Sequence, residues 1–165
     1  MPLALVRYGD FCVREVVGSK VKIMPLGKLS HSVIGCAIAV VQSRFVIFSG
    51  GSAFNMVSRD VYAFDAKDEQ WRSDELDYPK LKEDRRNHSS CSLGNTVYVY
   101  GGYNCEGKNT SRGFNKAVEW LPLDTTGKPA AVEWQSVVPA EDVAYRFNTL
   151  MAPIGKHSIL ILGGQ

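Results

Sequence analysis

Three glycine doublets, each directly preceded by an apolar run that favours a β-strand, constrain the fold of this 165-residue chain more than any other feature. They are Gly50-Gly51, Gly101-Gly102 and Gly163-Gly164, and the runs before them read FVIF, VYVY and ILIL. The doublets are 51 and 62 residues apart, an interval typical of a repeated supersecondary unit. We therefore expect a chain that repeats one structural module, with function carried by what the repeat displays.

Each doublet belongs to a longer pattern of strands. A second strand-like run precedes it, at residues 36–41, 89–93 and 149–154. Short turns separate the two runs, so each pair predicts an antiparallel hairpin. After the first doublet, residues 60–71 read as a strand, a polar turn and a tryptophan that opens another strand, and residues 116–124 and 131–134 repeat this order after the second doublet.

These residues resemble the kelch repeat, whose units are four-stranded blades of a β-propeller. The resemblance covers residues 36–165, and its markers are Gly50, Gly51, Tyr62, Asp65 and Trp71 in the first unit, Gly101, Gly102, Trp120 and Trp134 in the second, and Gly163 and Gly164 in the third. Two departures stand out: the interval from doublet to tryptophan grows from 20 to 32 residues, and the third unit lacks its second half.

The resemblance implies an all-β fold of kelch-type β-propeller blades, each of four antiparallel strands, in a ring that this chain leaves incomplete. Glycine would permit close approach of strand ends near the axis, and the aromatic markers Tyr62 and Trp71 would fill the space between blades. The alternative is a two-layer β-sandwich in which unrelated hairpin corners carry the glycines.

Read in blades, the chain divides into four parts. They are an N-terminal hairpin at 1–30, which could supply outer strands of a preceding blade, kelch-like blades at 31–80 and 81–140, and the first strand pair of a further blade at 141–165. Propellers close with about 4–8 blades, so we expect a second copy, another chain or further sequence to complete the ring. In a two-copy ring, residues 149–162 of one chain would pair with 11–24 of the other.

The loops after the second and fourth strands of a blade should emerge at one end, where long loops on a rigid scaffold collect binding residues. Arginine suits carboxylates, so we expect a protein or peptide partner, with an acidic one favoured. The candidate binding residues are Arg59, Arg85, Arg86, Tyr103, Asn104, Arg112, Tyr145 and Arg146. The same loops hold acidic residues, and most of these charges should form a solvated rim.

Other function classes find little support in the sequence. Metalloprotease, nucleophile-elbow, P-loop and dinucleotide motifs do not occur, and His88 at a loop-to-strand boundary favours a structural hydrogen bond over general-base work. A net charge of +2 is too weak to indicate a nucleic-acid surface. The longest nearly apolar run, residues 33–41, is too short to span a membrane.

The four cysteines form no C-x-x-C pair, so we expect no metal or cofactor and a reducing, cytoplasmic setting. A copper radical oxidase of the galactose-oxidase type is the enzymatic alternative that the resemblance raises, through Tyr98, Tyr100, Tyr103 and Cys105, but such enzymes are secreted and need a full ring. We therefore expect a non-enzymatic protein-interaction module or scaffold. The alternative is a substrate adaptor of a ubiquitin ligase within a longer protein.

Overall fold

The protein is described by a computed structural model in which two compact units divide the chain, residues 1–33 and residues 34–165. The structure describes residues 3–7, 10–17, 20–28, 34–53, 56–72, 77–104, 113–140 and 145–165. The described residues contain no α-helix, and none of them belongs to a helix that could cross a membrane. The chain is all-β, as the sequence predicts.

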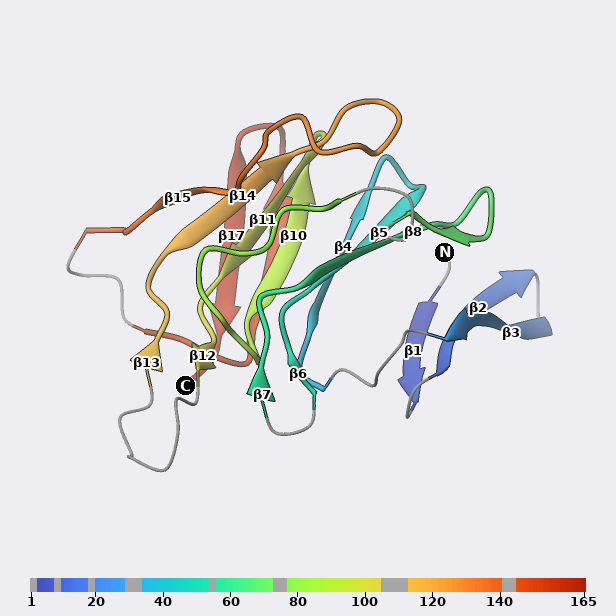
Figure 1. The fold of residues 1–165 in the computed structure, drawn as a ribbon, viewed down its shortest axis with the longest axis horizontal. Coiled ribbons are helices and arrows are strands. Elements are labelled where there is room, and N and C mark those ends of the chain that lie inside the picture. The colour runs from blue at the N-terminus through green and yellow to red at the C-terminus, as the bar shows by residue number, and fades with distance from the viewer. Residues whose placement is uncertain are drawn as a thin grey trace. The chain divides into compact units, whose positions relative to one another are not determined.

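The first unit is a three-stranded antiparallel sheet of β1 (Leu3–Arg7), β2 (Asp10–Val17) and β3 (Lys20–Lys28) (Figure 1). β2 and β3 pair with Val17 opposite Lys20. β1 is a strand that the sequence did not predict, because its apolar run is short and ends at Arg7. The assignment of this sheet to a preceding blade stays a prediction.

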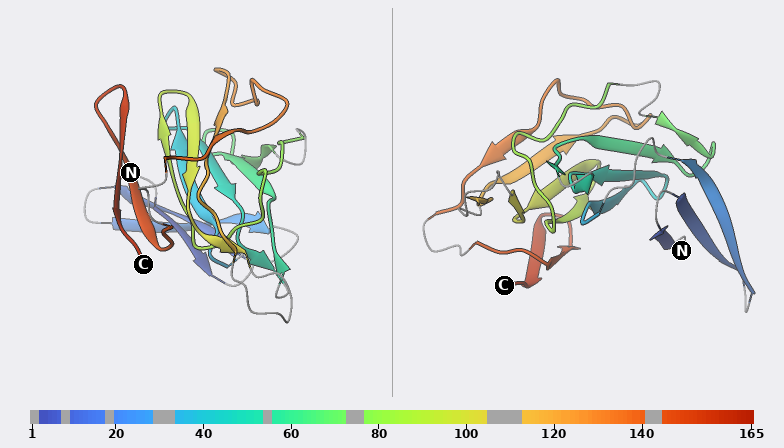
Figure 2. Two further views of the ribbon diagram at one scale, coloured as in Figure 1. Left: turned by 90° about the vertical axis from the view of Figure 1, so that its left-hand side faces the viewer. Right: turned by 60° about the horizontal axis from the view of Figure 1, so that its bottom comes forward.

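The described residues of the second unit form two four-stranded antiparallel sheets and three two-stranded sheets, of which one follows the two larger sheets in the chain (Figure 2). The first is β4 (Ala37–Val41), β5 (Phe45–Ser49), β8 (Val61–Asp65) and β9 (Gln70–Trp71). The second is β10 (Ser89–Leu93), β11 (Thr96–Tyr100), β14 (Val118–Pro122) and β15 (Gln135–Val137), and the third is β16 (Thr149–Ile154) and β17 (Ser158–Gly163). Each four-stranded sheet has sequential strand order, which is the order of a propeller blade.

Two short hairpins interrupt the connections between the second and third strands of the blades. They are β6 (Ser52–Ala53) with β7 (Met56–Val57), and β12 (Tyr103–Asn104) with β13 (Gly113–Phe114). The first strands β4, β10 and β16 neighbour one another, so the three sheets follow in chain order. The sequence predicts that Trp134 opens the fourth strand of the second blade, and β15 begins one residue after it.

The core lies between the two four-stranded sheets, because alternate residues of each strand point to this shared space. Phe45 and Ile47 of β5 face Val97 and Val99 of β11, and all four side chains are fully buried. Trp134 closes the core from the connection to β15 and donates its indole N–H to the Pro79 carbonyl at 2.8 Å.

The glycine doublets occur where one blade meets the backbone of the next. Gly51 donates its N–H to the Arg85 carbonyl at 2.8 Å, and Gly102 donates to the Arg146 carbonyl at 2.9 Å. Gly50 and Gly101 have positive φ angles of 57° and 72°. A Cβ on Gly50 would lie closer to the Arg85 carbonyl oxygen than van der Waals contact allows, and a Cβ on Gly101 would do the same at the Arg146 carbonyl oxygen. The doublets are therefore required by main-chain contact between neighbouring blades, and not only by a turn.

A second row of main-chain bonds joins the blades just before their first strands. Asn87 donates its N–H to the Gly35 carbonyl, and Asn148 donates to the Asn87 carbonyl, both at 2.8 Å. All three residues have positive φ angles, of 55° at the asparagines and 70° at the glycine, and asparagine and glycine tolerate this region best. The repeated unit is thus marked by these positive φ angles and main-chain hydrogen bonds as well as by the glycine doublets.

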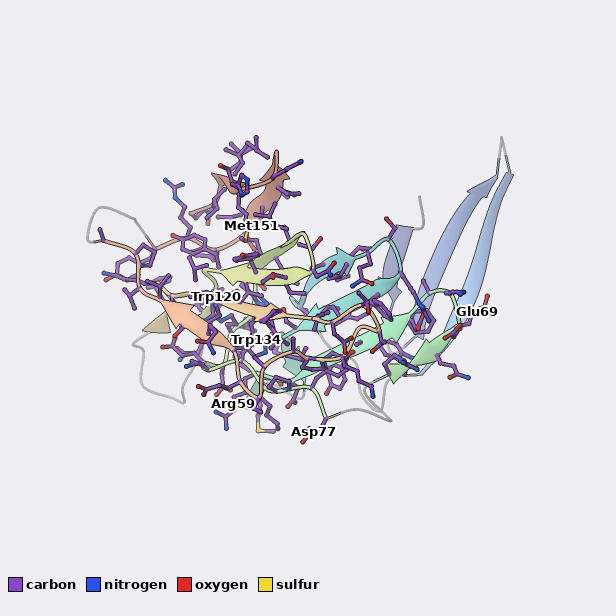
Figure 3. All side chains as sticks on the ribbon, turned by 90° about the horizontal axis from the view of Figure 1, so that it is seen from above. Arg59, Glu69, Asp77, Trp120, Trp134 and Met151 are labelled. Carbon is purple, nitrogen blue, oxygen red and sulfur yellow. The ribbon has the colours of Figure 1, made fainter. Side chains whose placement is uncertain are left out.

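The aromatic markers lie on different sides of the blades. Trp71 packs on Phe48 and Phe64, with ring centroids 5.5 and 5.3 Å apart, and strand alternation places this set with Tyr62 on the face of the first blade that points away from the second. Tyr62 and Trp71 therefore do not fill the space between these two blades. Trp134 fills it, and Figure 3 shows Met151, Trp120 and Trp134 following one another across the sheets.

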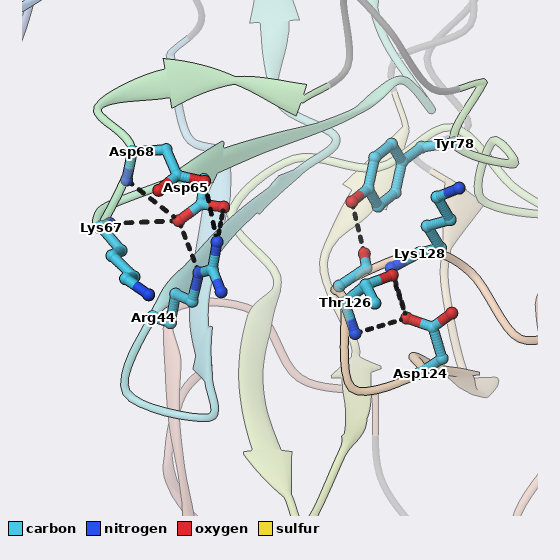
Figure 4. A network of polar contacts seen from close by, with 9 residues as sticks. Arg44, Asp65, Lys67, Asp68, Tyr78, Asp124, Thr126 and Lys128 are labelled. Atoms are coloured by element: carbon cyan, nitrogen blue, oxygen red, sulfur yellow. Dashed lines mark hydrogen bonds and ion pairs between the residues drawn. The ribbon is translucent and has the colours of Figure 1, made fainter.

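Asp65 is a fully buried carboxylate that organises the β8–β9 turn (Figure 4). Arg44 donates to both its oxygens at 2.8 and 2.7 Å, and Lys67 N–H donates at 3.1 Å. The hydrogen bond from Arg44 holds the pKa of Asp65 below its usual range. In the second blade, the Asp124 carboxylate also holds a turn together, because it accepts hydrogen bonds from the backbone N–H groups of Thr126 and Lys128.

The third sheet leaves an apolar face open among the described residues. Thr149 and Met151 point toward the second blade, and the Thr149 hydroxyl bonds to Ser89 at 2.6 Å. The opposite face of β16 and β17 carries four exposed apolar side chains. Their exposed fractions are 72% for Leu150, 51% for Ile154, 37% for Leu160 and 51% for Leu162.

Candidate functional site

The loops that follow the second and fourth strands of the blades meet at one end of the sheets, as the antiparallel order predicts. The Leu81 N–H donates to the Arg59 carbonyl at 2.9 Å, and the Tyr103 N–H donates to the Arg86 carbonyl at 3.1 Å. The hairpins β6–β7 and β12–β13 lie at this end in Figure 1. We call it the loop end; the turns after β4, β10 and β16 lie at the opposite end.

Four aromatic rings form a continuous row at the loop end, between the second blade and the third sheet. Tyr103 meets Phe147 edge-on with centroids 5.4 Å apart, Phe147 stacks on Phe114 at 6.1 Å, and Phe114 meets Tyr145 at 5.5 Å. Phe114 is 38% exposed and Tyr145 is 49% exposed. Rings in mutual contact keep a fixed shape at low entropic cost, which suits a surface that receives a partner.

A cation caps each end of this row. The Arg86 guanidinium lies 4.9 Å from the centroid of Tyr103, and the Lys116 ammonium lies 4.4 Å from the centroid of Tyr145. Both distances are within the range of cation–π attraction. We refer to the row Arg86, Tyr103, Phe147, Phe114, Tyr145 and Lys116 as the ring cluster.

The structure brings three predicted binding residues into the ring cluster, namely Arg86, Tyr103 and Tyr145. Two more border it: Asn104 faces Gly113 across the β12–β13 pair, and the exposed Arg146 donates to the Gly163 carbonyl at 2.8 Å. Arg59 is exposed at the loop end without belonging to the cluster. Arg112 lies outside the described residues.

Arg85 is a correction to the predicted set, because its side chain is completely buried. Its Nη2 forms an ion pair with Glu119, which is equally buried, and its Nη1 donates to the carbonyls of Gly101 and Ala117 at 3.3 and 3.4 Å. Glu119 also accepts the Lys82 N–H at 2.8 Å. Burial lowers the pKa of Arg85 while the nearby Glu119 charge raises it. Arg85 thus joins the blades internally and is not offered to a partner.

His88 lies between two glycine doublets. A Cβ on Gly50 would come within 2.7 Å of its ring, and a Cβ on Gly102 within 2.8 Å of its own Cβ. Its Nε2 bonds to the Ser49 hydroxyl at 2.9 Å. This confirms the expected structural hydrogen bond. A Ser–His pair so deeply buried has no access to a substrate, and Nδ1 has no hydrogen-bond partner among the described residues to orient the ring for base catalysis.

We expect the stability of the protein to fall in mild acid because of His88. Burial lowers its pKa from 6.5 to about 3, so between these values the unfolded chain binds one more proton than the folded protein. The free energy of unfolding should therefore rise with pH, by at most about 1.4 kcal/mol per pH unit from this group, and level off above pH 6.5.

The measurement is urea denaturation from pH 4 to pH 8 for the parent protein and for His88→Gln, whose amide can still reach Ser49. Carboxylates such as Asp65 contribute to acid sensitivity in both proteins, so the difference between the two curves isolates the imidazole. Parallel curves would show that His88 can bind its proton in the folded state.

Sequence reasoning missed Phe114, Phe147 and Lys116 because it searched the loops for arginine and tyrosine. A signal for Glu119 was present: it alternates with Leu121 in β14, so the period of the strand places it on the core face. A charge at such a position requires a buried partner. The adjacent residues Arg85 and Arg86 give no local signal of which one pairs with Glu119.

The described residues at the loop end supply aromatic rings and cations, which are groups suited to binding. His, Cys, Asp and Glu residues in the part of the chain that the structure describes form no group of three that could hold a metal ion. Burial raises the pKa of the Cys91 thiol to about 11 and also raises that of Cys36, so neither described thiol is an activated nucleophile.

Comparison with known proteins agrees with this geometry. Residues 84–112, which run from the loop before β10 through the second glycine doublet, match the model of the Kelch motif. The chain is 23% identical over 122 residues to Kelch domain-containing protein 3 of Bos taurus, covering 72% of this chain and 30% of the relative. The chain carries a Kelch motif and is similar to kelch-repeat proteins over most of its length.

Two further relatives extend the kelch match along the chain. Kelch repeat protein M-T8 of Myxoma virus (strain Lausanne) is 28% identical over 130 residues, covering 79% of this chain and 22% of the viral protein. Kelch-like protein 25 of Homo sapiens is 29% identical over 157 residues, covering 94% of this chain and 23% of the human protein. The chain thus spans less than a third of the length of these relatives.

A solved structure supports the blade architecture. The chain superimposes on the structure of YjhT with a TM-score of 0.69 at 14% sequence identity, covering 89% of this chain and 50% of that one. At this identity the likeness shows the fold alone. The fold is that of kelch-type β-propeller blades, in place of the two-layer sandwich that the sequence left open.

Proposed function

We propose that this kelch chain is a non-enzymatic protein-interaction module that binds its partner at the loop end. Kelch repeats generally mediate protein–protein interaction. The observation that carries the proposal is the ring cluster, because contiguous exposed aromatic side chains with flanking cations are typical of the anchoring part of a protein interface. The cations favour an acidic partner by charge complementarity.

Paired substitutions at the two ends of the sheets test this proposal. Tyr145→Ala at the loop end should weaken capture of a partner from cell extract by about tenfold or more, as the loss of an aromatic anchor does. Val132→Ala is the matched control, because Val132 is 96% exposed in the turn region at the opposite end. Equal binding by both variants would place the partner elsewhere on the blades.

The role within a larger assembly is a second part of the proposal. A scaffold of the cytoplasm is favoured, and the unmodified thiols Cys36 and Cys91 are compatible with a reducing compartment. The alternative is that these blades select substrates for a ubiquitin ligase within a longer protein. A galactose-oxidase-like copper enzyme is the enzymatic alternative. His, Cys, Asp and Glu among the described residues form no group of three that could hold a metal ion, and Cys105 lies outside the described residues.

We also propose that a further strand-bearing segment completes the ring against the third sheet, from a second copy, another chain or further sequence of this protein. Gly163 supports this. Its φ of 67° resembles that of Gly101, yet a Cβ there would meet nothing within 4 Å. At Gly50 and Gly101 the same position is filled by a main-chain carbonyl of the next blade. Exposed Leu150 and Leu162 beside it favour coverage by an apolar face.

A further inference from the structure

We propose that the Lys116 end of the ring cluster reads a two-residue feature in the partner: an apolar or aromatic side chain with a carboxylate close to it in the sequence. This inference rests on the proposed function, because it specifies the chemistry of the partner at the same site. The step beyond that function is that one apolar seat and one cation are held at a fixed spacing.

The apolar seat is formed by Phe114 and Tyr145. These are the two exposed rings of the row, and their centroids lie 5.5 Å apart with planes tilted by 45°. The exposed parts of the two rings lie side by side and form one apolar surface. An aromatic or branched side chain of a partner can pack on this surface and make edge-to-face contacts, which contribute beyond the area they bury.

The seat is rigid because its support is buried. Phe147 is half-buried and stacks behind Phe114, and the row continues to Tyr103. Asn115, next to Phe114, is buried and donates its side-chain amide to the Asp84 carbonyl at 3.1 Å. Neither exposed ring must be ordered when a partner arrives, which lowers the entropic cost of binding.

The cation is Lys116, held over Tyr145 at 4.4 Å. No carboxylate among the described residues forms an ion pair with its ammonium group, whereas Lys80 and Lys82 pair with Asp60 and Glu133. Its side chain is half-buried, so its charge is less screened than that of an extended surface lysine. A carboxylate placed next to the bound apolar side chain would meet this charge directly.

The order of the two subsites predicts what the partner segment must contain. Lys116 lies over Tyr145 at the exposed end of the row, directly beside the apolar seat, so the carboxylate and the apolar side chain must be near neighbours. A peptide with either group alone satisfies one subsite. A basic residue in place of the carboxylate would be repelled by Lys116 and by the nearby exposed Arg146.

The experiment uses the full chain and immobilised peptides that carry Phe or Leu at a central position with Asp, Asn or Lys at neighbouring positions. We expect the Phe–Asp peptides to bind at least tenfold more tightly than the Phe–Asn and Ala–Asp peptides, and Phe–Lys peptides not to bind. Lys116→Gln should remove the preference for Asp over Asn while retaining weak binding of the Phe peptides. Phe114→Ala should weaken all of them.

Lys156→Gln is the matched control, because it removes the same charge from an exposed turn at the opposite end. Binding that ignores the carboxylate, or a preference that survives Lys116→Gln, would overturn this inference. That result would leave the proposed function standing if Tyr145→Ala still impaired capture of a natural partner. If Lys116→Gln left the peptide preference unchanged and Tyr145→Ala left capture of the partner unchanged, both this inference and the proposed function would be refuted.

Discussion

Replacing Arg85 by methionine is expected to destabilise the protein by about 3–5 kcal/mol, the cost of leaving a buried charge without its partner. Glu119 is completely buried and, among the described residues, would keep only the Lys82 N–H as a donor. The carbonyls of Gly101 and Ala117 would lose a donor as well. A loss of this size is a large fraction of the stability of an ordinary domain.

The measurement is the midpoint of urea unfolding at constant m-value. Arg59→Met is the matched control, since Arg59 is exposed at the loop end and its side chain should matter by less than about 0.5 kcal/mol. The double variant Arg85→Met, Glu119→Leu should recover much of the lost stability, because it removes both charges. If Arg85→Met cost no more than Arg59→Met, the ion pair would not exist in the folded protein.

Gly101→Ala should be among the most damaging substitutions of a single methyl group in this chain. The φ of 72° costs a side chain about 1–2 kcal/mol, and the added Cβ would also press into the Arg146 carbonyl, which is backbone and cannot rotate away. The third sheet must shift away from the second blade or Gly102 must give up its hydrogen bond to the same carbonyl. We expect a total loss of about 3 kcal/mol or more, since both penalties add.

Gly94→Ala separates the two penalties. Gly94 has a φ of 59° in an open turn, and a Cβ there would meet nothing within 4 Å. It should therefore show the conformational cost alone, about 1–2 kcal/mol. Equal effects at Gly101 and Gly94 would contradict the steric part of the argument. Gly163→Ala then tests ring completion: it should behave like Gly94→Ala if the third sheet is open, and like Gly101→Ala if a further segment covers it.

The hairpin pattern predicted the inner strands of the blades well, because burial and period 2 act locally along the sequence. β10 and β16 begin and end where their runs do. The outer strands were less predictable: residues 131–134 carry an apolar pattern, but Trp134 is used in the core and β15 starts after it. Tertiary packing decided that boundary, and no local signal contains it.

The sequence predicted which loops carry the candidate site, but only some of the residues that form it. Antiparallel order fixed which loops meet, and Arg86, Tyr103 and Tyr145 lie there in contact with other members of the ring cluster. The failure at Arg85 has a physical cause. Two adjacent arginines point in different directions from an extended backbone, so one enters the space beside Glu119 and the other remains with Tyr103.

The main-chain link through Gly35, Asn87 and Asn148 has a mechanical consequence for a kelch array of this kind. Each blade is tied to its neighbour by groups that every amino acid carries, so the register between modules does not depend on the side chains at their surfaces. Exposed loop residues around such a frame can change without loosening it, whereas the buried Arg85 in the loop before β10 must be retained. New recognition surfaces could therefore be installed on these blades by loop exchange, provided that the three left-handed positions and the doublets remain untouched.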